Sequence, residues 1–217
     1  MSKQELLQKI YSEGLDDKIK MLKAYAISQS NESFELHVNL GINPKISDQM
    51  FVHKCTLPQS TGKSIKILAF VPESLQNQAS EADFLINEEY LDKIKKNKIF
   101  FDVCVATPEM MKMLSPLAKI LGPRGLMPNA KLGTLTSNVA EAIQSLKRGQ
   151  LSIKNDRYGI LHIPIGKAEH SLSHLKENIE YMIEFISTRR PQSLKGNMIL
   201  SVHLSTTMGP SVLLGSK

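Results

Sequence analysis

The chain contains no tryptophan, only two cysteines and no long apolar segment. Of its 217 residues 41% are hydrophobic and 6% aromatic, but no apolar run approaches the roughly twenty residues that a helix needs to cross a bilayer. A membrane protein is therefore not expected. Cys55 and Cys104 are not in a C-x-x-C arrangement, and both lie in apolar, strand-like runs. We expect reduced, buried thiols and a reducing compartment.

The first residues lack the features of a targeting peptide. They contain no hydrophobic core and carry an early acid, Glu5, so neither a secretory nor a transit peptide is expected. The composition is rich in Lys, Ile and Asn, which suits an AT-rich genome and favours an organelle-encoded protein. The mitochondrial matrix is then the expected compartment, with the bacterial cytoplasm or the plastid stroma as alternatives.

Catalytic and metal-binding motifs are also absent from the sequence. There is no G-x-S-x-G elbow, and no segment has the G-x-x-x-x-G-K-[ST] order of a phosphate-binding loop. His170 and His174 are four residues apart, a spacing that suits a metal on a helix. However, no third ligand is evident, and their Ser and Lys neighbours predict a solvated face; the other histidines are scattered along the chain. We predict no metal, no cofactor and no enzymatic activity.

The most informative segment present is the loop that runs from Ile120 to Gly133. It holds three glycines, two prolines and no carboxylate, and Lys119, Arg124 and Lys131 lie in or beside it. Proline removes backbone donors and glycine is conformationally permissive, so neither a helix nor a strand spans this segment. Long loops inside compact domains are usually functional. The alternatives are a plain basic surface turn and a cationic contact loop for RNA or another anion.

Residues 63–151 predict a small α/β domain. The apolar runs Ile65–Val71 and Phe101–Ala106 favour strands that are buried on both faces in a parallel sheet. Helices are expected over Glu88–Lys98, Pro108–Leu121 and Asn138–Lys147. This order predicts a three-layer, Rossmann-like domain.

Residues 1–62 and 152–217 have a different character. Phe34–Leu40 alternates apolar and polar residues, as a strand with one wet face does, and an apolar stripe predicts a helix over Leu172–Thr188. Two helices are expected in the first thirty residues, and short strands at Cys55–Leu57, Leu151–Ile153, Ile160–Ile163 and Met198–Leu204. We interpret both termini as one discontinuous α+β domain, which residues 63–151 interrupt as an inserted domain with glycine-containing crossings at each end.

Four blocks in this sequence resemble the large-subunit ribosomal protein L-one family, bacterial and organellar type. They are the Gly122–Gly133 loop, Phe101–Met111, Leu161–Lys167 with its H-x-P-x-G-K pattern, and Ser205–Val212. The resemblance implies a two-domain fold joined by two linkers and a structural role in the large ribosomal subunit. It further implies binding of the ribosomal RNA stalk near the exit site, transient contact with exiting transfer RNA, repression of the chain's own messenger, and a monomer when free.

The resemblance also implies an RNA-binding site on the terminal domain. Thr207, Met208 and Gly209 match the family's RNA-contacting Thr-Met-Gly, Ser201 matches its earlier hydroxyl, and Glu32 and Ser33 match its Glu-Thr pair. Lys54, Arg157 and Lys167 lie on expected strands or turns of this domain and are predicted to neutralise phosphates. A Ser/Thr-rich edge strand that ends in a turn is the alternative interpretation of residues 201–209.

Two features remain to be weighed against this assignment. Ser30 and Gln29 stand where the family usually has phenylalanine and lysine. The rival function is a small α/β enzyme that uses the Gly122–Gly133 loop as an anion site and Asp102 or Glu109 as a base. In the RNA-binding interpretation, Lys119, Arg124 and Lys131 form a second, weaker basic contact.

Overall fold

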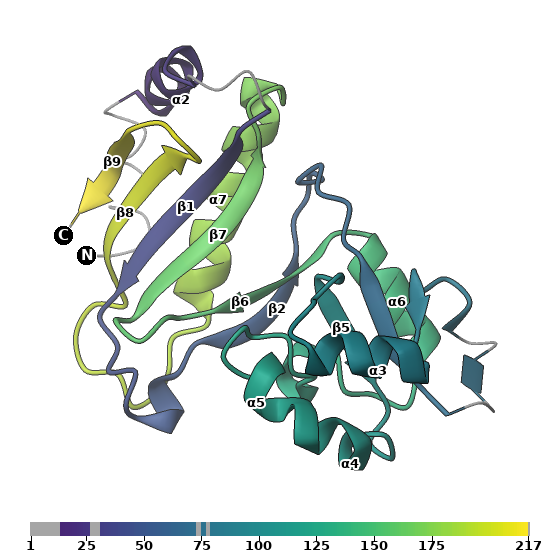
Figure 1. Cartoon of the computed structure of the whole chain (residues 1–217). Coiled ribbons are helices and arrows are strands. Elements are labelled where there is room, and N and C mark those ends of the chain that lie inside the picture. The colour runs from purple at the N-terminus through teal and green to yellow at the C-terminus, as the bar shows by residue number, and fades with distance from the viewer. Residues whose placement is uncertain (1–13, 27–30, 73–74, 77–78, 217) are drawn as a thin grey trace. The chain divides into compact units, whose positions relative to one another are not determined.

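A computed structural model describes residues 14–26, 31–72, 75–76 and 79–216. The chain divides into two compact units (Figure 1): one combines the residues up to Gly62 with those from Ile153 onward, and the other spans Lys63–Ser152. The second boundary lies one residue beyond the expected residue 151. The predicted mixed α/β fold class is confirmed. In the described part of the chain, no helix is both long and apolar enough to span a bilayer.

The first unit is built on a four-stranded antiparallel sheet of order β7-β1-β8-β9. Alternate residues of β1 are buried, and Leu36 and Val38 are fully enclosed. One face of the sheet is therefore covered and the other is open, as the period of two predicts. The strands are β1 (Ser33–Leu40), β7 (Ile160–Lys167), β8 (Ile199–Thr206) and β9 (Ser211–Ser216).

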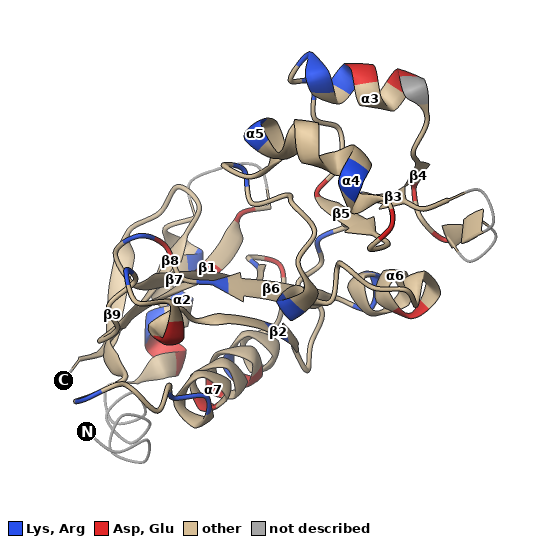
Figure 2. Ribbon diagram, turned by 90° about the horizontal axis from the view of Figure 1, so that it is seen from below, with Lys and Arg blue, Asp and Glu red and all other residues tan. Residues whose placement is uncertain are grey.

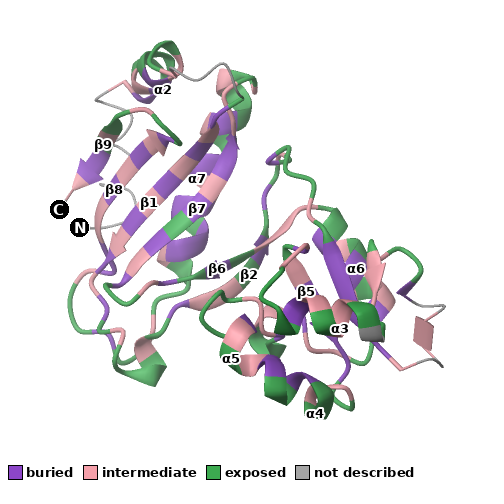
Figure 3. Cartoon of the chain, viewed as in Figure 1, coloured by how far each residue is buried: buried purple, intermediate pink, exposed green. Residues whose placement is uncertain are grey.

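Helix α7 (Leu172–Thr188) packs on the covered face of this sheet (Figures 1 and 3). It begins at Ser171, whose hydroxyl accepts a hydrogen bond from the His174 backbone N–H, and Pro191 follows shortly after its end. Its apolar stripe is buried throughout and includes Leu175, Ile179, Met182, Ile183 and Ile186. The shorter helix α2 (Leu15–Ala24) contacts α7, β8 and β9.

Asn178 is the polar centre of this packing and is fully buried. Its Nδ2 donates to the carbonyl oxygens of Ile165, at 2.8 Å, and Gln59, at 3.1 Å. Its Oδ1 accepts from the Gln59 backbone N–H at 3.1 Å. One side chain on α7 therefore holds both β7 and the segment that precedes the Gly62 crossing. A separate two-stranded sheet pairs β2 (Val52–Thr56) with β6 (Gln150–Lys154), and a short 3₁₀ helix, η1 (Ser47–Gln49), precedes β2.

The second unit contains a three-stranded parallel sheet of order β4-β3-β5. Alternate residues of β3 point to opposite faces, and each face has its own buried cluster. Leu68 and Phe70 pack with residues of α3, α4 and α5, whereas Ile67 and Ala69 pack with α6. The elements are β3 (Ile67–Phe70), β4 (Phe84–Leu85), α3 (Glu88–Lys95), β5 (Val103–Ala106), α4 (Met111–Leu114), η3 (Ser115–Leu117), α5 (Ala118–Leu121), η4 (Ala130–Leu132) and α6 (Val139–Lys147).

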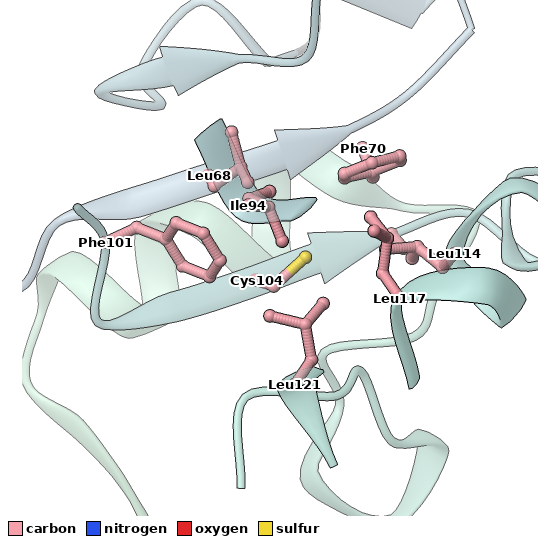
Figure 4. Close-up of a cluster of buried hydrophobic side chains, with 9 residues drawn as sticks. Leu68, Phe70, Ile94, Phe101, Cys104, Leu114, Leu117 and Leu121 are labelled. Atoms are coloured by element: carbon pink, nitrogen blue, oxygen red, sulfur yellow. The ribbon is translucent and has the colours of Figure 1, made fainter. Parts of the chain in front are cut away.

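Figure 4 shows the first of these clusters, where the Cys104 side chain lies among leucines and phenylalanines. Burial raises the pKa of the Cys104 thiol to about 12. Burial also raises the pKa of Cys55 to about 11, against a smaller opposing effect of Arg189. Both cysteines are free and buried, as predicted.

Two expectations about the secondary structure are corrected. Pro108–Leu121 is not one helix: α4 begins only at Met111, and the 3₁₀ turn η3 separates it from α5. Pro116 lies in that turn, where its missing N–H and its ring interrupt the helical hydrogen bonds. In addition, Met198–Leu204 was the last strand expected, but a further strand, β9, follows the turn after β8.

Replacing Asn178 with alanine should lower the free energy of unfolding by about 2–4 kcal/mol, because buried backbone groups of Gln59 and Ile165 lose their partner. Urea denaturation monitored by circular dichroism measures this effect. The matched control is Glu177→Ala, which removes only an exposed hydrogen bond to the Gln59 side chain and should cost less than about 0.5 kcal/mol. Equal effects of the two substitutions would contradict the assignment.

Candidate functional site

The turn from Thr207 to Pro210 is fastened to the start of β1. The Thr207 backbone N–H donates to the Ser33 carbonyl oxygen at 3.1 Å, and the Ser33 N–H donates to the Thr207 hydroxyl oxygen at 3.1 Å. The Met208 N–H donates to the Glu32 carboxylate at 3.3 Å. Residues far apart in sequence thus meet where β1 begins and β8 ends.

Glu32 lies beneath this turn and is only 3% exposed. Its carbonyl oxygen accepts a hydrogen bond from the Ala168 N–H at 2.8 Å, while its carboxylate holds Met208. A buried carboxylate that receives backbone donors fixes a loop. Among the predicted contact residues, Glu32 therefore positions the turn, whereas Thr207 and Met208 are exposed on it.

Gly209 is required by close packing within the turn. Its N–H donates to the Thr206 hydroxyl oxygen at 3.1 Å, and a Cβ on Gly209 would lie 2.2 Å from that oxygen. Thr206 is buried and was not among the predicted site residues. Buried and more exposed residues alternate along β8. This pattern places Thr206 on the covered face and Ser205 on the open face.

Met208 is the most conspicuous surface feature of the turn. Its side chain is 72% exposed, the highest value among the exposed large hydrophobic residues of the described chain. The Glu32 carboxylate holds its backbone, so an apolar side chain is presented to solvent from a fixed position. Such a residue is available for contact with a partner.

The remaining predicted contacts are spread along the sheet. Lys167 is paired with Ser33, next to the turn. Ser201 is paired with Asn39, six residues along β1 from Ser33 and hence about 20 Å away. The exposed Arg157 belongs to the turn just before β7, at the same end as Ser201, and stacks on Tyr158. Lys54 lies on β2 and is not part of this four-stranded sheet.

Three histidines that are scattered in sequence meet on the open face. His37 on β1 is paired with His162 on β7 and with His203 on β8. The Nδ1 atoms of His37 and His162 are 2.8 Å apart, and His37 Nε2 is 2.9 Å from the Ser205 hydroxyl oxygen. His162 Nε2 is 3.5 Å from the Asp156 carboxylate. The sequence analysis missed this group, since only the strand register reveals it.

The open face carries few formal charges (Figure 2). Glu35 is the only Asp, Glu, Lys or Arg residue of β1, Lys167 is the only one of β7, and β8 has none. Burial and the neighbouring His162 lower the pKa of His37, against an opposing effect of Glu35. Partial burial alone would raise the pKa of Asp156, but hydrogen bonds from the Ile160 and Tyr158 backbone and from His162 outweigh it and lower that pKa.

The predicted second basic site is an ordered, exposed loop on the other unit. Asn129 accepts a hydrogen bond from the Lys131 N–H at 2.8 Å, and its own N–H donates to the Thr134 hydroxyl oxygen at 2.8 Å. Leu126 and Met127 pack against the core of that unit. The side chains of Lys119, Arg124 and Lys131 are all exposed.

A cavity beside this loop does not suit the anion site of the enzyme alternative. It has a volume of about 110 Å³ and is lined by Asp102, Gly125, Met127 and Thr134 among others, but by no basic residue. The Asp102 carboxylate already accepts the Lys66 N–H at 3.0 Å, and Glu109 lies on the exposed surface. Within the described residues, no three His, Cys, Asp or Glu side chains are grouped to hold a metal ion.

Comparison with known proteins decides between the two predicted functions. The family model described as "Ribosomal protein L1p/L10e family" matches residues 22–210. The chain belongs to this family. The predicted family resemblance is thereby confirmed, and the enzyme alternative is wrong, because this is a family of ribosomal proteins and not of enzymes.

Bacterial relatives of the family match most of the chain. The large ribosomal subunit protein uL1 of Kosmotoga olearia is 43% identical over 202 residues, which cover 92% of this chain and 87% of the relative. The corresponding protein of Thermosipho africanus is 43% identical over 201 residues, and that of Actinobacillus succinogenes 40% over 200 residues; each covers 91% of this chain and 87% of the relative. Ser30 and Gln29, which depart from the family pattern, lie outside the described residues.

Substituting alanine for Gly209 should open the turn, because the new Cβ displaces the Thr206 hydroxyl and breaks its hydrogen bond. We expect the free energy needed to open the turn to fall by about 1–2 kcal/mol. Amide hydrogen exchange at Thr207, Met208 and Gly209, followed by NMR, measures this change. Ser211→Ala, on the exposed start of β9, is the control and should leave these amides protected. Unchanged exchange in the Gly209 variant would show that the turn does not need glycine.

Proposed function

We propose that this chain is a structural constituent of the large ribosomal subunit and binds its ribosomal RNA through the first unit. The observation that carries the proposal is the Thr207–Pro210 turn, which Glu32 and Ser33 hold at the end of β8 with Thr207 and Met208 exposed. The relatives of this chain described above are named as large ribosomal subunit proteins. The net charge of +6 also favours a polyanionic partner.

The chemistry of the turn and the open face suits RNA. Hydroxyl groups and exposed backbone recognise 2′-hydroxyls and phosphates, and Ser33, Ser205 and Ser201 supply hydroxyls along the face. The small Gly209 permits a nucleic-acid backbone to approach closely, while Met208 offers an apolar surface to a sugar or base. Lys167 and Arg157, at opposite ends of the open face, supply phosphate contacts. Such contacts fix the position of the RNA more than they read its base sequence.

The finer assignments of function rest on the family resemblance. The RNA is the mobile stalk near the transfer RNA exit site, and the basic loop of Lys119, Arg124 and Lys131 meets departing transfer RNA. Repression of the chain's own messenger uses the same RNA site, and the free protein is a monomer. The relatives named above are bacterial, which suits a bacterial-type ribosome. The composition rich in Lys, Ile and Asn, which suits an AT-rich genome, supports an organellar ribosome in the mitochondrial matrix.

Truncating Met208 to alanine should weaken binding to the stalk fragment of large-subunit ribosomal RNA about tenfold, or about 1.4 kcal/mol. The side chain is exposed, so the fold should not change, and the loss would report lost contact with RNA. Filter binding measures the affinity and circular dichroism the fold. Met113→Ala is the matched control, since Met113 is a 53% exposed methionine on the other unit. Equal affinities of wild type and Met208→Ala would refute this contact.

Removing residues 64–150 and joining the ends with a short Gly/Ser linker should leave a folded protein that keeps most of its affinity for the stalk RNA. The reason is that each unit has its own buried core and own sheet. The double substitution Arg124→Glu with Lys131→Glu should likewise change stalk affinity less than about twofold, because both side chains belong to the second unit and the proposed stalk site lies on the first. Loss of stalk binding in either protein would contradict the division of roles.

A further inference from the structure

The histidine row, defined as His162, His37 and His203, crosses three adjacent strands of the open face. In adjacent antiparallel strands, side chains directly opposite each other are about 5 Å apart. The row therefore forms a continuous line of imidazoles across the sheet. Along β1 it lies between Ser33, beside the Thr207–Pro210 turn, and Asn39, which is paired with Ser201. An RNA strand that touches both ends of the site must cross this row.

The hydrogen bonds of the row have one direction when all its histidines are neutral. Asp156 requires a proton on His162 Nε2, at 3.5 Å, so His162 Nδ1 accepts. His37 Nδ1 then donates across the 2.8 Å contact, and His37 Nε2 accepts from the Ser205 hydroxyl. In this arrangement every donor faces an acceptor.

One added proton reverses the direction of these hydrogen bonds without breaking any of them. When His162 is an imidazolium, its Nε2–H donates to Asp156 and its Nδ1–H donates to His37 Nδ1. His37 then carries its proton on Nε2 and donates to Ser205. A second proton on the same pair would place two N–H groups face to face, so it requires the pair to separate. The His37–His162 pair thus takes up one proton in place, and His203 is a further site.

Charged groups on the neighbouring elements act on the row in both directions. Glu35 on β1 and Asp156 in the turn before β7 favour positive charge, whereas mutual repulsion of the imidazoles and burial of His37 oppose it. From β9 the row meets Leu213, whose carbonyl oxygen accepts from Lys18 of α2. On β8 its neighbour is the hydroxyl of Ser205. While the histidines are neutral, Glu35 and Lys167 are the only charged side chains that β1, β7 and β8 contribute to this face.

We propose that the histidine row is an additional contact for the RNA phosphate backbone, and that it takes up protons when RNA binds. This inference rests on the proposed RNA-binding function of the same face. A phosphate near an imidazole favours the charged form, and the resulting bond is charge-assisted. Binding then strengthens as pH falls through the pKa values of the bound state and weakens as pH rises above them. Burial and the neighbouring His162 hold the pKa of His37 in the free protein below its ordinary value, so a phosphate that favours the charged form can raise it and draw in a proton.

The test is the affinity of the full chain for the stalk RNA fragment at pH 8 and pH 6, with ionic strength held constant because phosphate binding depends on salt. Wild type should bind about tenfold more tightly at pH 6, which corresponds to a net uptake of roughly half a proton over two pH units. The triple variant His37→Gln, His162→Gln, His203→Gln should change less than about twofold over the same range. The control His174→Gln, on α7 beyond the covered face, should keep the wild-type ratio.

A second measurement does not depend on the fold of the triple variant. NMR titration of the wild-type imidazole signals, with and without RNA, should show raised pKa values for the row in the complex and an unchanged value for His174. Equal wild-type affinity at both pH values, or unaltered pKa values in the complex, would overturn the proposal while leaving RNA binding intact. Failure of wild type to bind at any pH would refute the proposed function itself, and this inference with it.

Discussion

The pairing of β1 between β7 and β8 is the interaction on which the rest of the structure depends. These strands are distant in sequence, so closing the sheet costs chain entropy that only extensive burial beneath α7 repays. The chain between β1 and β7 must leave the sheet and return to it, and that excursion contains the second unit with its own two-faced core. A discontinuous domain with an inserted one follows from where the partners of a single central strand lie in the sequence.

The same pairing builds the candidate site. Its turn belongs to the C-terminal part of the chain, but the groups that hold it are Glu32, just before β1, and Ser33, the first residue of β1. Neither segment has a defined surface without the other, because the Met208 and Thr207 backbone donors find their acceptors only across the sheet edge. The register also decides which side chains share the open face. A one-residue shift in the register of β1 would turn His37 toward the core and expose Leu36 and Val38.

Sequence reasoning succeeded where a local pattern carries the information. The alternation of β1 and the apolar stripe of α7 depend only on which side meets the core, and both elements have nearly the predicted bounds. It failed where the structure depends on competing local preferences or on residues that are distant in the sequence. Pro116 divides a segment whose apolar spacing favours one helix, and the histidine row belongs to the site through cross-strand neighbours. No local pattern distinguishes the buried Glu32, which holds the turn, from an exposed contact residue.

The distribution of charge bears on how such a surface selects its partner. The chain is basic overall, but much of the excess lies elsewhere, for example at the C-terminal end of α3 and around the Gly122–Gly133 loop (Figure 2). A face with little fixed charge gains little from non-specific attraction to any polyanion. Its affinity then depends on hydroxyl groups, backbone geometry and charge acquired on contact. These interactions form only when the ligand presents phosphates and 2′-hydroxyls at matching positions, so low fixed charge favours discrimination between RNA structures over general electrostatic binding.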